Sequence, residues 1–488
     1  SQALPGFILL GLPDTALTEA KDRVRSAAKN TGIALAQRKL TINLTPATLA
    51  KRGSGFDLSL VMAALQADQK IKSSGKTIFL GELGLDGSIR PIPGILPAVH
   101  SAVSAGFEQI VVPEENLSEA QLVPGADVRG FSSLAELLVA SGLEQHEVRF
   151  PHKPSEKQQT ATTNTPINVP DMADVAGQAE GRYALEIAAA GAHHIMFKGP
   201  PGAGKTMLAE RLASILPKLS DEDAMDVTAI HSLCDAGNPR TQLIRRPPFE
   251  SPHHSASAPA ILGGGSGVPK PGAISRSHRG VLFLDEAPEF KRTVLDSLRQ
   301  PLESGRIIID RATASAEYPA RFQLVLAANP CPCGMNFGRG LDCTCSARER
   351  RTYFNRLSGP LLDRIDLHIT VPRVSSDELS NMTPQESSET IRQRVIQARG
   401  AQKERLTPFG VSTNTEASGK LLRGPLKLDA SLTQDLRKAI DRGSLTARGF
   451  DRVLRTAWTI ADLDGATAPT KEHLDLALYF RNLSLDQL

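Results

Sequence analysis

The stretch HHIMFKGPPGAGKTMLAERLASIL, residues 193–216, decides the fold. It opens with a short apolar run typical of a buried strand, passes through a Gly-rich loop and ends in a helical pattern. The loop fits the phosphate-binding pattern G-x-x-x-x-G-K-[ST], in the strand-to-helix context which that pattern requires. We expect its backbone N–H groups to cradle phosphate oxygens, with Lys205 at the β- and γ-phosphates and Thr206 on Mg²⁺. The predicted nucleotide-binding residues are Gly199, Pro200, Pro201, Gly202, Ala203, Gly204, Lys205 and Thr206.

Two later apolar strands also end in polar residues. VLFLDE, residues 281–286, ends in Asp285 and Glu286, and FQLVLAAN, residues 322–329, ends in Asn329. The carboxyl ends of parallel strands meet at one edge of a sheet, so these groups should lie beside the phosphate loop. Asp285 would hold Mg²⁺ directly or through water, Glu286 would orient and polarise the attacking water, and Asn329 would hold that water or the γ-phosphate. The pattern predicts ATP hydrolysis.

Composition sets broad limits on the protein. Hydrophobic residues make up 40% and charged residues 22% of the 488-residue chain, which is typical of a globular protein with two to four domains. The 56 Lys and Arg residues against 53 Asp and Glu residues give a net charge of +3, so a nucleic-acid partner must be argued from local patches. No apolar run approaches the ~20 residues of a membrane span, and the first residues lack the order of a signal peptide. We therefore expect a cytoplasmic protein with no membrane partner.

Strand-like and helix-like segments divide the chain into four parts. Residues 1–145 alternate strands and helices and predict an α+β domain; residues 146–170 are polar, contain Pro and predict a linker. Short buried-type strands alternate with helices over residues 171–372, which predicts a largely parallel, wound sheet. Residues 373–488 are strongly helical. The fold class is therefore α/β, with helices at the carboxyl end.

Several segments together resemble AAA+ ATPases, and most closely the ComM/YifB family of magnesium-chelatase-like AAA+ proteins. They are residues 171–212 around the phosphate loop, RPPFESPHH, SPHHSAS, RQPLESGRI, NPCPCG and GPLLDRIDLHI. The resemblance covers essentially the whole chain, and NPCPCG with GPLLDRIDL is its most specific part. It implies an AAA+ core with a helical lid, preceded by a Lon-protease-like domain. It also implies about twenty further residues before Ser1.

The resemblance assigns two arginines to the nucleotide. In the wider clade of magnesium chelatases and MCM helicases, the Arg of the L-x-x-R-x-D-like segment is a finger that acts on the neighbouring subunit, and it maps to Arg364. The alternative is a local ion pair of Arg364 with Asp363 or Asp366. Arg448 matches the sensor-2 position of the lid. Arg452 and Arg455, on the same helix, remain alternatives to Arg448.

The segments at residues 41–65 and 81–102 resemble the Lon-type protease domain and its relative in the RadA recombination protein. Lon proteases carry a Ser nucleophile in the first segment and a Lys in the second, where this chain has Gly55 or Phe56, and Leu96. Ser54 lies one residue away but would lack activation. Without a nucleophile and a base, peptide hydrolysis by this mechanism is excluded. The domain should have a structural or binding role. Lys51 and Arg52 could touch nucleic acid or form a solvated turn.

Four of the five cysteines gather in NPCPCGMNFGRGLDCTC, residues 329–345. Cys331, Cys333, Cys343 and Cys345 form C-x-C-x9-C-x-C, and two such pairs joined by a Gly-containing loop can meet around a tetrahedral Zn²⁺. The C-x-C spacing is tighter than the usual C-x₂-C. Free thiols or a redox-labile pair are the alternatives.

Three basic residues are candidates for contact with DNA. Arg311 lies near the turn of a hairpin expected over residues 304–322, which in the MCM-like clade projects into the channel of the ring. Lys270 lies in a Gly/Pro-rich insertion that also holds His253 and His254, for which simple hydrogen bonding is expected. Arg339 lies in the cysteine loop, before an arginine-rich, aromatic-bearing stretch that could contact a strand. Asp342 and Glu349 could instead make that stretch a salt-bridged surface.

The resemblance implies a homo-hexameric, ATP-driven DNA helicase that promotes branch migration when incoming strands recombine during natural transformation. Single- and double-stranded DNA would pass through the channel of the ring. The alternative is a chelatase-type AAA+ ATPase that remodels proteins. Chelatase subunits usually lack both the NPCPCG loop and a Lon-like domain, and this chain carries both.

Overall fold

The computed structural model divides into two compact units. The first holds residues 1–165 and 221–244, and the second holds residues 166–220 and 245–488. The structure describes residues 6–10, 15–33, 35, 39–45, 54–72, 75–151, 170–234, 240–265, 269–311, 314–338, 340–374 and 385–482. Most of the expected linker, together with Lys51, Arg52 and Arg339, lies outside the described residues.

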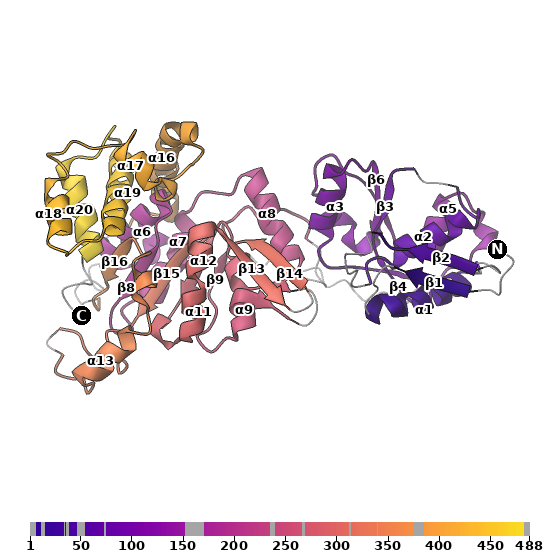
Figure 1. Ribbon diagram of the computed structural model, residues 1–488, viewed down its shortest axis with the longest axis horizontal. Coiled ribbons are helices and arrows are strands. Elements are labelled where there is room, and N and C mark those ends of the chain that lie inside the picture. The colour runs from indigo at the N-terminus through magenta and orange to yellow at the C-terminus, as the bar shows by residue number, and fades with distance from the viewer. Residues whose placement is uncertain are drawn as a thin grey trace. The chain divides into compact units, whose positions relative to one another are not determined.

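The first unit combines small sheets with helices, as its alternating sequence predicts (Figure 1). Strands β3, β6 and β7 form a parallel sheet, β1 pairs in parallel with β2, and β4 pairs antiparallel with β5. Its strands are β1 Gly6–Leu10, β2 Lys39–Asn43, β3 Thr77–Phe79, β4 Glu82–Leu83, β5 Ile89–Arg90, β6 Gln109–Pro113 and β7 Asp127–Phe131. Its helices are α1 Thr15–Asn30, α2 Asp57–Ala67, α3 Ile95–Ser104, α4 Leu117–Ala120, α5 Leu134–Ala140 and α8 Asp221–Ser232.

Helix α2 shows how the core of this unit forms. Leu58, Val61 and Leu65 recur at helical spacing and are completely buried. Asp57 at the start of the helix is also buried, and Nε of Arg23 donates to its carboxylate at 2.8 Å. Burial raises the pKa of Asp57, and the hydrogen bond from Arg23 opposes that shift. The ion pair therefore ties α1 to α2 inside the core.

Helix α8 packs with the first unit, although it lies within the range expected for the ATPase core. Met225 and Ala229 of α8 contact the apolar cluster that contains Leu96 of α3. The backbone N–H of Gly94 donates to the carbonyl of Ser232 at 3.1 Å. The chain thus leaves the second unit after α7, adds a helix to the first unit, and returns before β9.

The second unit is built on a five-stranded parallel sheet with the order β16-β8-β15-β12-β9. Four of these strands, and the parallel pairing, confirm the expectation from the sequence. They are β8 Ile195–Lys198, β12 Val281–Leu284, β15 Gln323–Ala328 and β16 Leu367–Thr370. The fifth, β9 Phe249–Glu250, was not predicted, because two residues give no periodic signal.

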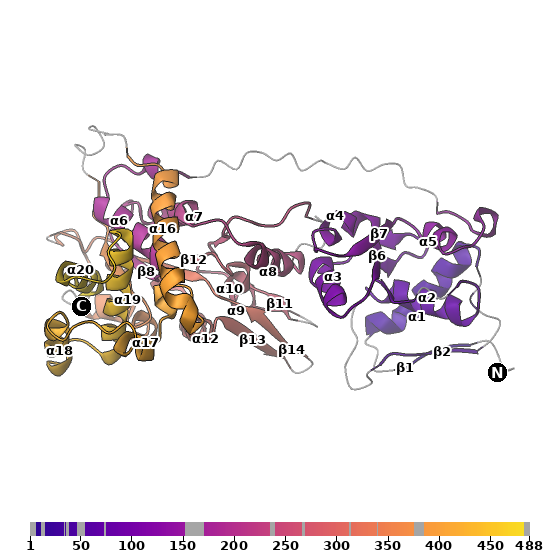
Figure 2. The same ribbon diagram turned by 90° about the horizontal axis from the view of Figure 1, so that it is seen from above.

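Successive side chains along each strand of the sheet point alternately into two hydrophobic cores. Phe197 and Phe283 face one core, which α6, α7 and the carboxyl-terminal helices complete. Met196 and Leu282 face the other core, which is covered by α11, α12 and a hairpin. Figure 2 shows α16 and α19 beside α6. The helices of this unit are α6 Ala179–Gly191, α7 Lys205–Ile215, α9 Ala258–Leu262, α10 Ala273–Arg276, α11 Arg292–Ser297, α12 Arg299–Ser304, α13 Ala347–Phe354, α14 Gly359–Leu362, α16 Ser388–Leu406, α17 Gly419–Arg423, α18 Gln434–Asp441, α19 Ala447–Leu463 and α20 Lys471–Asn482.

Two hairpins lie together on the second unit. Strands β13 Arg306–Arg311 and β14 Ala314–Pro319 pair antiparallel and confirm the expected hairpin. Strands β10 Gly263–Gly264 and β11 Lys270–Pro271 form the other pair. The hydroxyl of Tyr318 donates to the carbonyl of Pro269 at 2.5 Å and joins the two hairpins.

Candidate active site

Lys205 lies at the carboxyl edge of the parallel sheet, where β8, β12 and β15 end. Its Nζ donates to the carbonyls of Gly199 and Pro200 at 2.7 and 2.9 Å, and to Oδ1 of Asn329 at 3.0 Å. Burial lowers the pKa of Lys205, while the negative charges of Asp285 and Glu286 oppose that shift. The structure thus brings the predicted phosphate-binding amine of Lys205 into direct contact with the side-chain amide of Asn329.

The two oxygens predicted to hold Mg²⁺ also meet. The hydroxyl of Thr206, on the first turn of α7, donates to Oδ2 of Asp285 at 2.7 Å. Mg²⁺ prefers oxygen ligands such as a hydroxyl and a carboxylate. It usually takes only one or two ligands from the protein, and water and phosphate oxygens supply the others. The donor set therefore fits a magnesium site.

The backbone of residues 199–206 has the shape of an anion-binding loop. Gly204, at the amino end of α7, has φ of +91°, a left-handed conformation that glycine adopts without strain. A Cβ on Gly199 would lie 2.3 Å from the carbonyl oxygen of Val371, so only glycine fits that close approach. Turns of this kind point successive N–H groups at one place, where a phosphate can bind.

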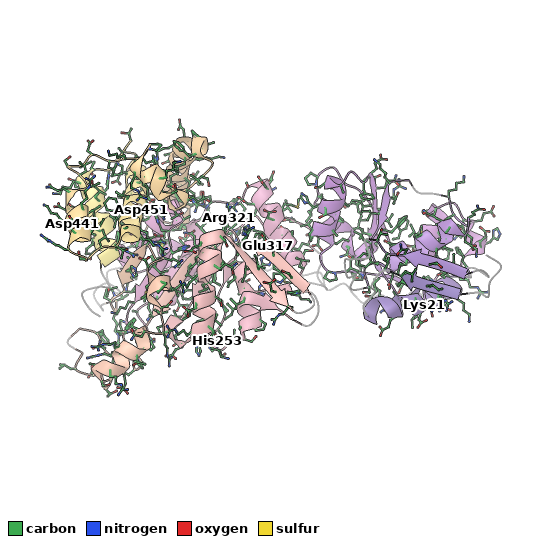
Figure 3. All side chains as sticks on the ribbon, in the orientation of Figure 1. Lys21, His253, Glu317, Arg321, Asp441 and Asp451 are labelled. Atoms are coloured by element: carbon green, nitrogen blue, oxygen red, sulfur yellow. The ribbon has the colours of Figure 1, made fainter. Side chains whose placement is uncertain are left out.

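Glu286 has a neighbour that the sequence did not predict. Its backbone is left-handed, with φ of +49°, and its N–H donates to Oδ1 of Asp285 at 2.8 Å. Nδ1 of His254 lies 3.1 Å from Oε2 of Glu286. The ring of His253, labelled in Figure 3, stacks on His254 with centroids 4.1 Å apart. The two histidines follow β9, which pairs with β12, so sheet order brings His254 to the predicted base.

Arg364 and Arg448 gather around Arg299. The Arg364 side chain is only 8% exposed, forms an ion pair with Glu303, and donates to the carbonyl of Pro360 at 2.6 Å. Its ion-pair partner is therefore neither Asp363 nor Asp366, the two acids expected for a local ion pair. Burial lowers the pKa of Arg364, and the positive charges of Arg299 and Arg448 add to the shift.

Arg448 is the most accessible of the three lid arginines. Its side chain is 71% exposed and lies 4.0 Å from Asp363, whereas Arg452 is paired with the buried Asp366. Arg455 donates to the carbonyl of Ala417 at 2.8 Å. A cavity of about 690 Å³, lined by Arg299, Arg448 and Asp363 among others, includes no residue of the range 199–206. Arg299 and Arg448 therefore line one cavity, and Arg364 lines a second one together with Arg299.

The four clustered cysteines meet as the zinc hypothesis requires. Their sulfur atoms all lie within 4.8 Å of one another, and Cys331 Sγ is 3.3 Å from Cys333 Sγ and 3.7 Å from Cys343 Sγ. Sulfurs bound to one tetrahedral Zn²⁺ at about 2.3 Å lie about 3.8 Å apart. Burial raises the pKa of Cys331 to about 12, and a hydrogen bond from the backbone of Met335 lowers the pKa of Cys333 to about 6. The donor set fits a zinc site.

The Lon-like place in the first unit is different. The hydroxyl of Ser54 donates to Glu82, and Leu96, where Lon proteases carry lysine, is completely buried. No amine stands near Ser54 from that position.

Two of the three DNA candidates lie together. Lys270 pairs in register with Gly264, and a Cβ on Gly264 would lie 2.5 Å from Nη2 of Arg311. Both Lys270 and Arg311 are exposed. Arg339 lies outside the described residues.

The sheet order, the Gly-rich loop and the groups at the strand ends define a P-loop protein of the AAA+ class. Family models agree: "Magnesium chelatase, subunit ChlI" matches residues 171–379, "Subunit ChlI of Mg-chelatase" matches residues 1–116, and "Magnesium chelatase, subunit ChlI C-terminal" matches residues 385–481. None of the described helices is long and apolar enough to cross a membrane.

Individual relatives narrow the family. The chain is 41% identical to protein YifB of Escherichia coli over all of this chain and 93% of that protein. It is 40% identical to competence protein ComM of Haemophilus influenzae over 99% of this chain and 93% of that protein. Lon protease 2 of Bacillus subtilis is 33% identical over 30% of this chain and 27% of its own length, at the amino-terminal part. The chain belongs to the ComM/YifB family of magnesium-chelatase-like AAA+ proteins, with a Lon-like region.

Proposed function

We propose that this protein is an ATP-driven DNA helicase that works as a homo-hexameric ring in the cytoplasm and promotes branch migration during natural transformation. The observation that carries the proposal is the convergence of Lys205, Thr206, Asp285, Glu286 and Asn329 at one sheet edge. The relationship to competence protein ComM supports the DNA substrate. Membership of the AAA+ class supports ATP hydrolysis as its energy source.

Each group at the edge has a role in this proposal. Lys205 neutralises charge on the β- and γ-phosphates, and Thr206 and Asp285 hold Mg²⁺. Bound Mg²⁺ supplies positive charge to the phosphate oxygens. Glu286 accepts a hydrogen bond from the attacking water and polarises it, and Asn329 orients that water or the γ-phosphate.

We assign Arg364 to the nucleotide of the neighbouring subunit and Arg448 to the sensor-2 position of the lid. They lie together around Arg299, and their described ion pairs are with Glu303 and Asp363 rather than with any group at the Lys205 edge. A cation reaching across a subunit boundary stabilises charge on the transferring phosphoryl group. Hydrolysis would then require an assembled ring.

DNA contact is assigned to the paired hairpins. Arg311 and Lys270 are exposed and adjacent, so one phosphate-rich strand can meet both. Contacts of this kind are insensitive to base sequence and weaken steeply as salt rises. Arg339 belongs to this assignment from its sequence alone.

A chelatase-type protein-remodelling ATPase is the second candidate. The family models for magnesium chelatase match three ranges of the chain and favour it. Such an enzyme would couple the same ATP hydrolysis to a protein partner, so DNA would leave its turnover unchanged.

The test measures the ATP hydrolysis rate with and without single-stranded DNA at low salt. We expect stimulation by DNA in the parent protein and its loss in Arg311→Ala. Arg306→Ala is the matched control, because Arg306 lies on the same strand and pairs with Glu317 at 3.0 Å. Equal stimulation of both variants would remove Arg311 from the DNA path. The absence of any DNA effect on the parent would favour the protein-remodelling function.

A further inference from the structure

A cavity of about 910 Å³ lies beside the P-loop, between the ends of β8 and β16 and helix α13. Its volume is within the ~300–1,000 Å³ of small-molecule sites. Four cations and two aromatic rings in its lining stand out: Lys198, Arg350, Arg351, Arg373, Phe337 and Phe354. None of the described residues that line the cavity is acidic.

Two described acidic residues, Glu349 on α13 and Glu289 beside Arg356, have partners outside this cavity. Glu349 accepts a hydrogen bond from the backbone N–H of Ser346 at 2.7 Å and so caps α13. Glu289 forms an ion pair at 2.7 Å with Arg356, which does not line the cavity. Burial lowers the pKa of Lys198. Among the described residues, the cations of the cavity therefore face it without a matching carboxylate in its lining, an arrangement that attracts an anion.

Each aromatic ring in the cavity carries a cation on one face. The guanidinium carbon of Arg373 lies 4.6 Å from the ring centre of Phe337, and Nζ of Lys198 lies 4.8 Å from that of Phe354. Aromatic rings next to a cationic path are what single-stranded nucleic acid uses, since bases stack on the rings and phosphates bind the cations. A nucleotide is the ligand that matches both halves of the lining.

The wall of this cavity also touches the P-loop. Gly199 and Pro200 contribute to the lining. In the cysteine loop, Gly334 has φ of +76°, and a Cβ there would lie 2.6 Å from Cγ of Pro201. The cysteine loop is therefore packed against the phosphate-binding loop. A ligand in the cavity would also contact the phosphate-binding loop.

We propose that this cavity binds a short segment of single-stranded DNA, with a base against Phe337 or Phe354 and phosphates on Arg350, Arg351 and Arg373. The inference rests on the proposed DNA function and adds a second contact site to that of Arg311. A free nucleotide shares the same chemistry, so the experiment separates the two sources. Because Gly199 and Pro200 line the cavity, DNA bound there would lie against the phosphate-binding loop.

The experiment measures binding of a fluorescent thymidine oligonucleotide by anisotropy, with a non-hydrolysable ATP analogue present. Arg351→Glu should weaken binding at least tenfold relative to Arg348→Glu, which makes the same change on the same helix at a residue outside the cavity lining. Phe337→Ala should weaken binding about tenfold through lost stacking. The slope of log affinity against log salt should fall by about 0.7 for each lost phosphate contact.

Equal binding by Arg351→Glu and Arg348→Glu, with the parent protein binding tightly, would overturn the cavity site and leave the proposed function standing. Failure of the parent itself to bind would overturn the proposed function first. Displacement of the oligonucleotide by millimolar thymidine monophosphate would replace the strand with a free nucleotide. Mass photometry completes the test: loss of oligomers in Arg351→Glu alone would show that the cavity faces a neighbouring subunit, against the proposal.

Discussion

The two units differ most at the places where each would do chemistry. At the sheet edge of the second unit, an amine, a hydroxyl, a carboxylate and an amide are joined by hydrogen bonds of 2.7–3.0 Å. At the Lon-like place of the first unit, Ser54 pairs with Glu82 and a buried leucine, Leu96, stands where the amine would be. A fold can persist after its reactive groups are replaced, because packing and chemistry depend on different residues.

Leu96 has a packing role in the first unit. It belongs to the apolar cluster of α3, and α8 packs on that cluster through Met225 and Ala229. The segment that carries the lysine in Lon proteases here packs against α8, a helix that follows the P-loop in the sequence.

The largest effect is expected from substitutions at the sheet edge of the second unit. Lys205→Ala should abolish nucleotide binding, and Glu286→Gln should keep binding but lower turnover about 10⁴-fold, because it removes the group that polarises water. Filter binding and a phosphate-release assay measure the two quantities. Ser54→Ala is the control from the first unit and should change neither. Parental turnover in Glu286→Gln would remove its assignment.

The next effect tests whether Arg364 acts between subunits. Arg364→Ala should keep nucleotide affinity and lower turnover about 10³-fold, as for a finger acting in trans. Mixing it with Lys205→Ala should restore part of the activity, since each variant supplies the group that the other lacks. Arg356→Ala, which loses an exposed ion pair with Glu289 and a hydrogen bond to the carbonyl of Pro288, should retain parental turnover. If no mixing ratio restores activity, the arginine acts within its own subunit.

A smaller effect probes the first unit. Leu96→Lys should destabilise it by ~3–5 kcal/mol, because a charge would be buried without a partner. Leu85→Lys is the matched control, since Leu85 is 58% exposed, and it should change stability little. Denaturant unfolding followed by circular dichroism measures both. The double variant Gly55→Ser, Leu96→Lys should still cleave no peptide, and cleavage would show that the dyad can be rebuilt.

The smallest effect concerns the cysteine loop. The protein should hold one Zn²⁺ per chain, and Cys343→Ser should lose it, whereas Cys234→Ser, in the first unit, should not. Removing the metal should lower the thermal midpoint by a few degrees without unfolding the chain, because four thiolates stabilise one Gly-containing loop. Elemental analysis and calorimetry test this. Protein purified without chelator and free of zinc would end the assignment.

Local motifs made the sheet edge predictable. Fewer than ten consecutive residues identify each of three motifs: the P-loop, the acidic strand and the strand ending in Asn329. The carboxyl ends of parallel strands lie at one edge of a sheet, so the three motifs were expected to meet. The hairpin of β13 and β14 was predictable for the same reason.

Contacts between distant segments were not predictable. His254 reaches Glu286 only because the two-residue strand β9 pairs with β12. Arg364 meets Glu303, which is 61 positions away, rather than its neighbouring acids. The placement of α8 on α3 depends on the whole chain path. Sequence spacing carries no signal for such contacts.

The most direct test of the account is strand displacement on a synthetic three-strand junction that mimics a recombining single strand. Purified protein with ATP and Mg²⁺ should move the junction and release the displaced strand, and Glu286→Gln should bind the junction without releasing it. Release of the strand should require ATP hydrolysis and be independent of base sequence. Parental protein that hydrolyses ATP at the same rate with and without the junction, and releases no strand, would contradict it.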